Sequence, residues 1–132
     1  MEVRVDLAQI IICETREQQI IVLRERNGAR QLPIVIGLTE ALAVDRRLKG
    51  HQLPRPLTHD LLANVIKQLS AELERIVIND LQEHTFYAKL VVRAQGELVE
   101  IDSRPSDAIA LGVGTNTPIF VEDNVLDQVE KA

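Results

Sequence analysis

Aromatic residues are scarce in this sequence. Tryptophan is absent, and the only aromatic side chains among the 132 residues are Phe86, Tyr87 and Phe120. Proteins that hold single-stranded nucleic acid by stacking successive bases need several such rings on one surface. This sequence has too few aromatic side chains to favour a stacking surface of that kind.

Cysteine is nearly absent as well, because Cys13 stands alone and cannot form an intramolecular disulfide. A single cysteine inside the apolar run 10–13 is typical of a reduced, cytoplasmic protein. No apolar run approaches the ~20 residues of a membrane span. The first residues, MEVRVDL, alternate charged and apolar side chains and do not resemble a signal peptide. We therefore expect a soluble, cytoplasmic protein that does not cross a membrane.

Positive charge is in deficit, since the formal net charge is -5 and the sequence pI is near 5.2. Domains that coat nucleic acid by bulk electrostatics are usually basic overall. Any polyanion would need a local basic patch. The length of 132 residues and the 45% hydrophobic content suit one sizeable core, so we expect a single domain over 1–132.

The order of hydrophobic patterns predicts an α+β fold. Alternating or continuous apolar runs bounded by turn residues indicate strands, and apolar residues at helical spacing indicate helices. The predicted strands are 3–12, 19–24, 31–36, 75–81, 85–92, 97–101 and 118–121, and the predicted helices are 38–48, 58–69, 105–113 and 123–131. Sequential short strands favour antiparallel meanders, so we expect a mostly antiparallel or mixed sheet packed by helices.

The two halves of the chain resemble each other at a separation of 67 residues. The segment TEALAV at 39–44 matches SDAIAL at 106–111 in chemical type, position by position. The same separation carries the predicted turn at 13–17 onto 80–84 and the strand at 18–25 onto 85–92. This predicts a duplicated unit of three strands and a helix, with both copies sharing one core.

The repeat also offers a structural explanation for some acidic residues. Glu40 and Asp107 fall in the first turns of predicted helices, where a carboxylate is stabilised by the helix dipole by about 0.3–1 kcal/mol. Asp102 and Arg104 have no charged counterparts in the first half. They form either a local ion pair or a carboxylate and a guanidinium available for catalysis and phosphate binding.

A second polar segment follows the first predicted helix. It is rich in positive charge: Arg46, Arg47, Lys49 and Arg55. A solvated loop is the ordinary interpretation, but the segment is also the best candidate for a local phosphate-binding patch. Thr58 fits the cap of the next helix, which places His59 in its first turn.

Five motifs together resemble the bifunctional nuclease domain family. They are LPIVIGLTEALAV (32–44), RPLTHDLL (55–62), HTFYAKL (84–90), IDSRPSDAIAL (101–111) and PIFVEDNVL (118–126). The resemblance covers almost the whole chain and implies a compact α/β domain that degrades both DNA and RNA. The chain departs from the family at His84, where a glycine is common, and at 112–114, where a basic residue is common.

The resemblance supports a nuclease hypothesis in which Asp102, Asp107 and Glu40 bind Mg²⁺ or Mn²⁺ and His59 does acid–base work. The phosphate would lie on Arg55 and Arg104, with Arg46, Arg47 and Lys49 as further substrate-binding residues. No Asp-x-Asp repeat or His-Glu-x-x-His motif is present.

A noncatalytic binding or assembly module is the alternative hypothesis. In that case the polar motifs fix helix starts and subunit contacts. The long apolar strand at 3–12 would pair across a homo-oligomer interface if it lay at a sheet edge.

Overall fold

The computed structural model describes residues 1–131 as seven strands and four helices. The elements are β1 (Glu2–Ile11), β2 (Gln18–Glu25), β3 (Gln31–Gly37), α1 (Leu38–Leu48), α2 (Thr58–Gln68), β4 (Glu72–Gln82), β5 (Thr85–Ala94), β6 (Glu97–Ser103), α3 (Pro105–Gly114), β7 (Ile119–Glu122) and α4 (Asp123–Glu130). Each predicted strand and helix is present, with ends within about three residues of the prediction. The expected α+β class is confirmed.

Strand alternation decides which side chains enter the core. In β3, Leu32, Ile34 and Ile36 are buried, whereas Pro33 and Val35 between them are exposed. Successive side chains of a strand point to opposite faces, so one face of β3 meets the core and the other meets solvent. The strand is held on one side by β2 through an antiparallel pairing from Gln18 opposite Gly37 onward.

The seven strands form one sheet in the order β3-β2-β1-β7-β4-β5-β6. Every pairing is antiparallel except the parallel pairing of β4 with β7. The two halves of the order mirror each other around β7, which agrees with the predicted duplication of a unit of three strands and a helix. The assembly hypothesis required the first strand to lie at a sheet edge. That condition is not met, because β1 lies between β7, with which residues 2–5 pair, and β2, with which residues 5–11 pair.

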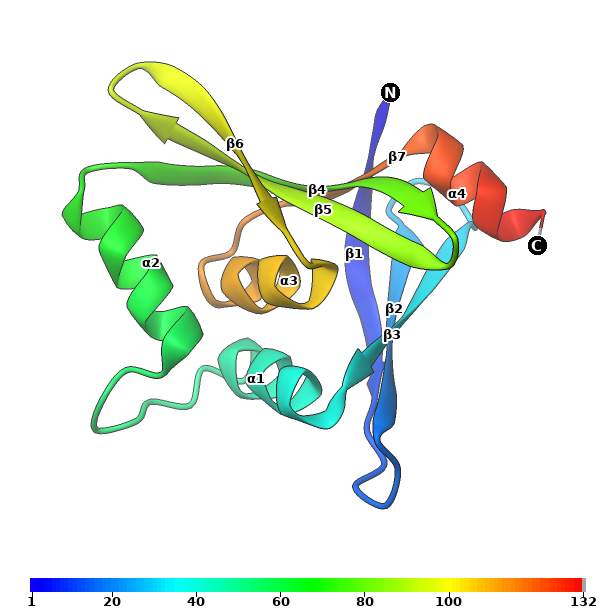
Figure 1. Ribbon diagram of the computed structural model, residues 1–132, viewed down its shortest axis with the longest axis horizontal. Coiled ribbons are helices and arrows are strands. Elements are labelled where there is room, and N and C mark those ends of the chain that lie inside the picture. Colours follow the sequence, from blue (N-terminus) through cyan, green and yellow to red (C-terminus); the bar gives the residue numbers. More distant parts are fainter. Residues whose placement is uncertain (132) are drawn as a thin grey trace.

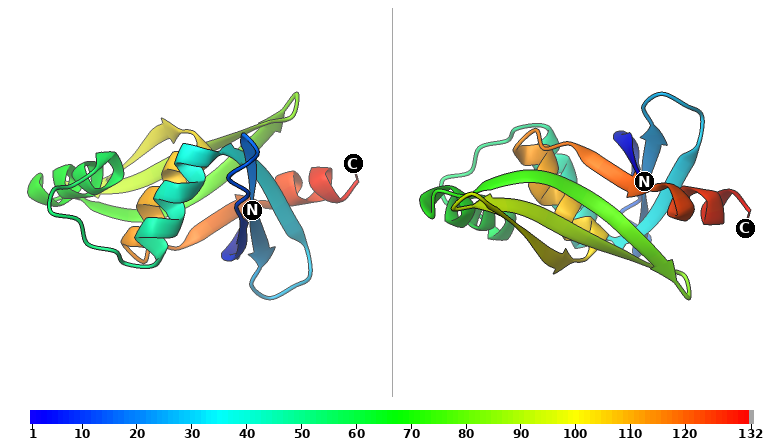
Figure 2. Two further views of the ribbon diagram at one scale, coloured as in Figure 1. Left: turned by 90° about the horizontal axis from the view of Figure 1, so that it is seen from below. Right: turned by 90° about the horizontal axis from the view of Figure 1, so that it is seen from above.

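The sheet is strongly twisted, and β1–β3 run steeply inclined to β4–β6 (Figure 1). Helices α1 and α3 lie together in the angle between these two groups of strands, with α2 beyond them (Figures 1 and 2). The core joins both halves, since buried side chains of β2, β4, α1 and α3 belong to one cluster. Gly112 of α3 allows the closest approach, because a Cβ there would overlap the Cδ1 of Ile76.

The repeat brings two helix starts to one region. Helices α1 and α3 begin at Leu38 and Pro105, 67 positions apart, and each directly follows the third strand of its unit. Helix α2, inserted between the units, begins beside them. Its cap position is occupied by Leu57, and not by Thr58 as predicted, because Asp60 accepts the Leu57 N–H and replaces the expected threonine cap.

Within residues 1–131, each helix is too short or too polar to pass through a lipid bilayer.

Candidate active site

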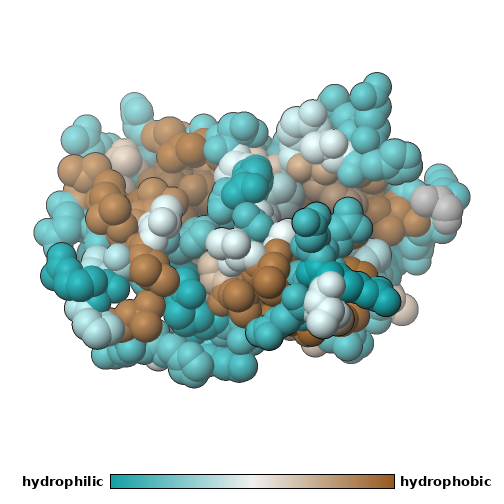
Figure 3. All heavy atoms as spheres, turned by 60° about the horizontal axis from the view of Figure 1, so that its bottom comes forward, coloured by the Kyte–Doolittle hydropathy of each residue, from teal (hydrophilic) through white to brown (hydrophobic). Residues whose placement is uncertain are grey.

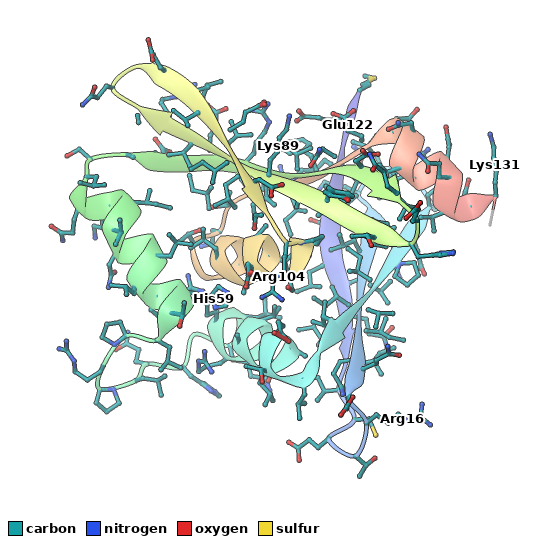
Figure 4. The ribbon with its side chains drawn as sticks, viewed as in Figure 1. Arg16, His59, Lys89, Arg104, Glu122 and Lys131 are labelled. Carbon is teal, nitrogen blue, oxygen red and sulfur yellow. The ribbon has the colours of Figure 1, made fainter. Side chains whose placement is uncertain are left out.

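The first turns of three helices bring four polar side chains into contact. Glu40 comes from α1, His59 from α2, and Arg104 and Asp107 from the start of α3. His59 Nε2 lies 3.0 Å from Asp107 Oδ1, Arg104 Nε lies 2.9 Å from Asp107 Oδ2, and Arg104 Nη2 lies 3.9 Å from Glu40 Oε2. These contacts form a continuous chain, which we call the polar cluster. Figure 4 shows Arg104 at the start of α3 and His59 at the start of α2.

Asp107 is the centre of the polar cluster. Partial burial by itself would raise the pKa of its carboxyl, but hydrogen bonds from Arg104 and His59 outweigh burial and the pKa lies below its ordinary value. Asp107 is therefore ionised at neutral pH. Because an ionised carboxylate only accepts hydrogen bonds, His59 Nε2 carries the proton between them.

Arg104 is the most exposed member, with 66% of its side chain accessible. Its hydrogen bond to Asp107 raises the pKa of its guanidinium, so the group stays charged. Arg104 also occupies the cap position of α3, and no side chain caps that helix start. An exposed guanidinium beside uncapped amides at a helix start is well suited to a phosphate.

A hollow of about 570 Å³ opens beside Arg104 and Glu40. We call it the strand-edge hollow, because much of its wall is β3 and the start of β5. Its lining residues are Glu17, Gln18, Pro33, Ile34, Val35, Ile36, Gly37, Glu40, His84, Thr85, Phe86, Arg104, Pro105 and Ser106. Two members of the polar cluster thus face a space that can receive a ligand.

The residues present do not fit the predicted three-carboxylate metal site. Among residues 1–131, no three His, Cys, Asp or Glu side chains are placed to hold one ion. Arg104 contacts both Glu40 and Asp107, so a guanidinium lies between the two carboxylates. The positive charge between these carboxylates is therefore that of Arg104.

Asp102 does not join the polar cluster. It lies opposite Lys89 in the pairing of β6 with β5, whereas Ala88 and Leu90 on either side of Lys89 belong to the core. By strand alternation, Asp102 and Lys89 lie on the outer face of the sheet, away from α1 and α3. The predicted grouping of Asp102 with Asp107 and Glu40 is therefore corrected. Asp102 lies on the outer face of the sheet, whereas Asp107 and Glu40 lie on the helices that cover the other face.

Arg47 is a structural residue in this fold, and its predicted place in a phosphate patch is corrected. Only 8% of its side chain is exposed. Its guanidinium donates to the Ala110 carbonyl at 2.6 Å and the Leu111 carbonyl at 3.3 Å, and it pairs with Asp60. It thereby ties α1 to α2 and to the end of α3.

The other predicted basic residues do not gather around the hollow. Lys49 pairs with Asp45 at 2.9 Å along α1, and Arg55 lies exposed in the loop before α2. Arg46 is half-buried at the end of α1. Of the predicted phosphate-binding residues, only Arg104 lines the strand-edge hollow.

Apart from Glu40 and Arg104, the residues lining the hollow were not predicted as site residues, and two of them, His84 and Phe86, come from the β4–β5 hairpin. The two-residue turn of this hairpin has positive φ at Glu83 (49°) and His84 (66°). A two-residue hairpin turn with both central residues left-handed usually prefers glycine, so the backbone at His84 favours the glycine that the family resemblance implies there. The departure from that glycine was the signal that could have singled out His84.

A sequence model of the bifunctional nuclease domain matches residues 21–132. The uncharacterized protein Rv1829 of Mycobacterium tuberculosis is 42% identical over 127 residues, which cover 96% of this chain and 74% of that protein. Bifunctional nuclease 2 of Oryza sativa subsp. japonica is 28% identical over 114 residues, covering 83% of this chain and 35% of the rice protein. Bifunctional nuclease 1 of Oryza sativa subsp. indica is 24% identical over 109 residues, with coverages of 80% and 33%. This chain therefore belongs to the bifunctional nuclease domain family.

Proposed function

We propose that this chain is a nuclease that cleaves phosphodiester bonds of DNA and RNA at the polar cluster. The supporting observation is that Arg104, exposed beside a ligand-sized hollow, lies between the carboxylates of Glu40 and Asp107. The rice relatives, which are named bifunctional nucleases, favour the same activity. We also propose a cytoplasmic location, on the ground of the single cysteine.

Arg104 binds and neutralises the phosphate in this proposal. Its guanidinium forks toward two oxygens of the diester, while the free amides at the start of α3 face the same charge. Asp107 holds the Nε side of Arg104 by its 2.9 Å hydrogen bond, while Nη2 lies 3.9 Å from Glu40, and both Arg104 and Glu40 line the hollow. The stabilisation provided by this positive charge increases as negative charge develops on the phosphate in the transition state.

Proton transfer is assigned to the two ends of the polar cluster. Glu40 lines the hollow and accepts a proton from the attacking water. In its doubly protonated form His59 keeps the Nε2 proton on Asp107 and donates the Nδ1 proton to the leaving oxygen, while the contact with Asp107 fixes the imidazole orientation that this transfer needs. The cleavage then breaks the bond between phosphorus and the leaving oxygen, and the water oxygen becomes part of the new phosphate monoester.

The test measures hydrolysis of bis(p-nitrophenyl) phosphate and of labelled DNA and RNA by purified variants. We expect Arg104→Ala and Glu40→Gln each to lower kcat/KM by about 10²–10³-fold, since each removes a group that acts in the transition state. Arg26→Ala is the matched control. Arg26 is also exposed and paired with a carboxylate, Asp6, but does not line the hollow.

Equal hydrolysis by the wild type and by folded Arg104→Ala and Glu40→Gln proteins would assign the activity to a contaminating enzyme and overturn the proposal. Circular dichroism establishes that the variants are folded. Assistance by Mg²⁺ or Mn²⁺ stays a prediction, and the same reactions in the presence of each ion and of a chelator test it.

A noncatalytic assembly module is the second candidate, favoured by the exposed apolar face of α2. No residue of α2 is fully buried, and exposed apolar side chains run along the helix and its start: Leu57, Leu61, Leu62, Val65 and Leu69. Figure 3 shows hydrophobic side chains gathered on the side of the molecule where α2 lies. Surfaces of this kind often mark protein contacts. A module of this class would self-associate in sedimentation experiments and show no cleavage in the assay above.

A further inference from the structure

The strand-edge hollow has an apolar part and a charged end. Pro33 and Val35 of β3 and Phe86 of β5 contribute apolar surface, and 58% of Val35 is exposed. Arg104 and Glu40 form the charged end. A phosphate alone needs only the charged end, so the apolar walls indicate a ligand with an apolar face attached to its phosphate.

The volume of the hollow limits that ligand. At about 570 Å³ it lies within the ordinary range of small-molecule pockets, roughly 300–1,000 Å³, which suits a single nucleotide. A duplex keeps its bases stacked in the interior of the helix. A duplex phosphate can reach Arg104, but the apolar walls stay empty unless a base leaves the stack.

β3 supplies hydrogen-bonding groups without selecting a sequence. It is the last strand of the sheet on its side, so one row of its backbone N–H and C=O groups has no partner strand. Pro33 contributes only its carbonyl. Backbone groups at a strand edge can meet the donors and acceptors of any base edge, which agrees with action on both DNA and RNA.

We propose that the strand-edge hollow holds one unpaired base next to the scissile phosphate, so that the substrate is single-stranded DNA or RNA. The base lies between the exposed face of β3 and Phe86, and its phosphate lies on Arg104. This inference rests on the proposed function. It requires only one aromatic side chain, in keeping with a chain that has three.

The first measurement compares a single strand with a duplex of the same sequence. Removing a base from a duplex stack is costly, so we expect single strands to be cleaved at least about tenfold faster than the duplex. A single strand with an abasic site beside the scissile diester should lose most of that advantage. Equal cleavage of single strand, abasic strand and duplex would overturn the inference.

The second measurement uses Val35→Glu, which places a charge in the apolar wall. Because Val35 is exposed in an edge strand, the fold should tolerate the change. We expect the ratio of single-strand cleavage to bis(p-nitrophenyl) phosphate hydrolysis to fall by about tenfold. Val99→Glu is the matched control, since Val99 is 44% exposed on β6, the strand at the other sheet edge. An unchanged ratio in Val35→Glu, or an equal fall in Val99→Glu, would contradict the inference.

The two proposals fail in different ways. If bis(p-nitrophenyl) phosphate and nucleic acids are hydrolysed with dependence on Arg104 but without preference for single strands, the proposed function stands and the inference falls. If nothing is hydrolysed, the proposed function falls. Fluorescence anisotropy of a labelled single strand then tests the hollow by binding alone: Val35→Glu must weaken binding relative to Val99→Glu, and equal binding overturns the inference.

Discussion

At the scale of single residues, Asp107 illustrates how one side chain can be structural and chemical at once. It sits in the first turn of α3, where the helix dipole favours negative charge, and it accepts hydrogen bonds from His59 and Arg104. The same contacts that lower the pKa of its carboxyl hold the polar cluster together. Removal of its charge should therefore affect stability as well as catalysis.

Asp107→Asn should destabilise the protein at neutral pH by about 0.5–1.5 kcal/mol, because it weakens the charged hydrogen bonds and the dipole contact. The folded state lowers the pKa of Asp107 below its ordinary 3.8, so this stabilisation is present above that value and is lost as pH falls through the folded-state pKa. Urea unfolding of wild type and variant across acidic and neutral pH should show the difference shrinking on acidification. A difference independent of pH would contradict this assignment.

The sequence and the structure agree for residues governed by helix starts. Asp107 and Glu40 could be placed in first turns from local pattern alone, because proline and the apolar spacing indicate where the helices begin. Arg47 and Asp102 could not be placed in this way. Arg47 is buried because it donates to the carbonyl of Ala110, and Asp102 lies on the outer face because it pairs opposite Lys89. Both neighbours are distant in sequence.

At the scale of elements, the contact of α3 with the sheet depends on a small residue. Gly112 faces β4 so closely that any side chain would meet Ile76, which is fully buried. The helix therefore packs closely against the sheet. This packing fixes the position of its start beside α1 and α2. The position of Arg104 follows from this packing.

Gly112→Ala should cost about 1–3 kcal/mol of unfolding free energy through overpacking. Ile76→Val alone should cost about 0.5–1.5 kcal/mol, but it removes the Cδ1 that the new methyl would overlap. The double variant should accordingly be more stable than the sum of the two losses, by about 1 kcal/mol. Thermal or urea unfolding of the four proteins measures this coupling, and strictly additive losses would show that the methyl is accommodated elsewhere.

At the scale of the whole molecule, β7 joins the two repeated units. It pairs antiparallel with β1 and parallel with β4, and Val121 within it is fully buried in the shared core. Helices α1 and α3 of the two units also pack against each other, and buried side chains of both units belong to one core. Unfolding should be cooperative across both halves.

Val121→Ala should lower the stability of both units together by about 1–3 kcal/mol, through lost burial and a cavity at their junction. Amide hydrogen exchange of β2 and β5 should show the same loss of protection in each. Val99→Ala, on the exposed β6 edge, should change stability by less than about 0.5 kcal/mol. Loss of protection confined to one unit would show that the halves unfold separately.

Local patterns determined the strands, the helices, the repeat and the family, because alternation, helical spacing and motif order are written in neighbouring residues. Only the tertiary structure decided that β1 is central, that Asp102 faces away, and that Glu40, His59, Arg104 and Asp107 meet. The reason is that strand order and helix packing are set by burial shared among distant segments. A local pattern does not indicate which strand will pair with a given strand edge, or which helix starts will lie side by side.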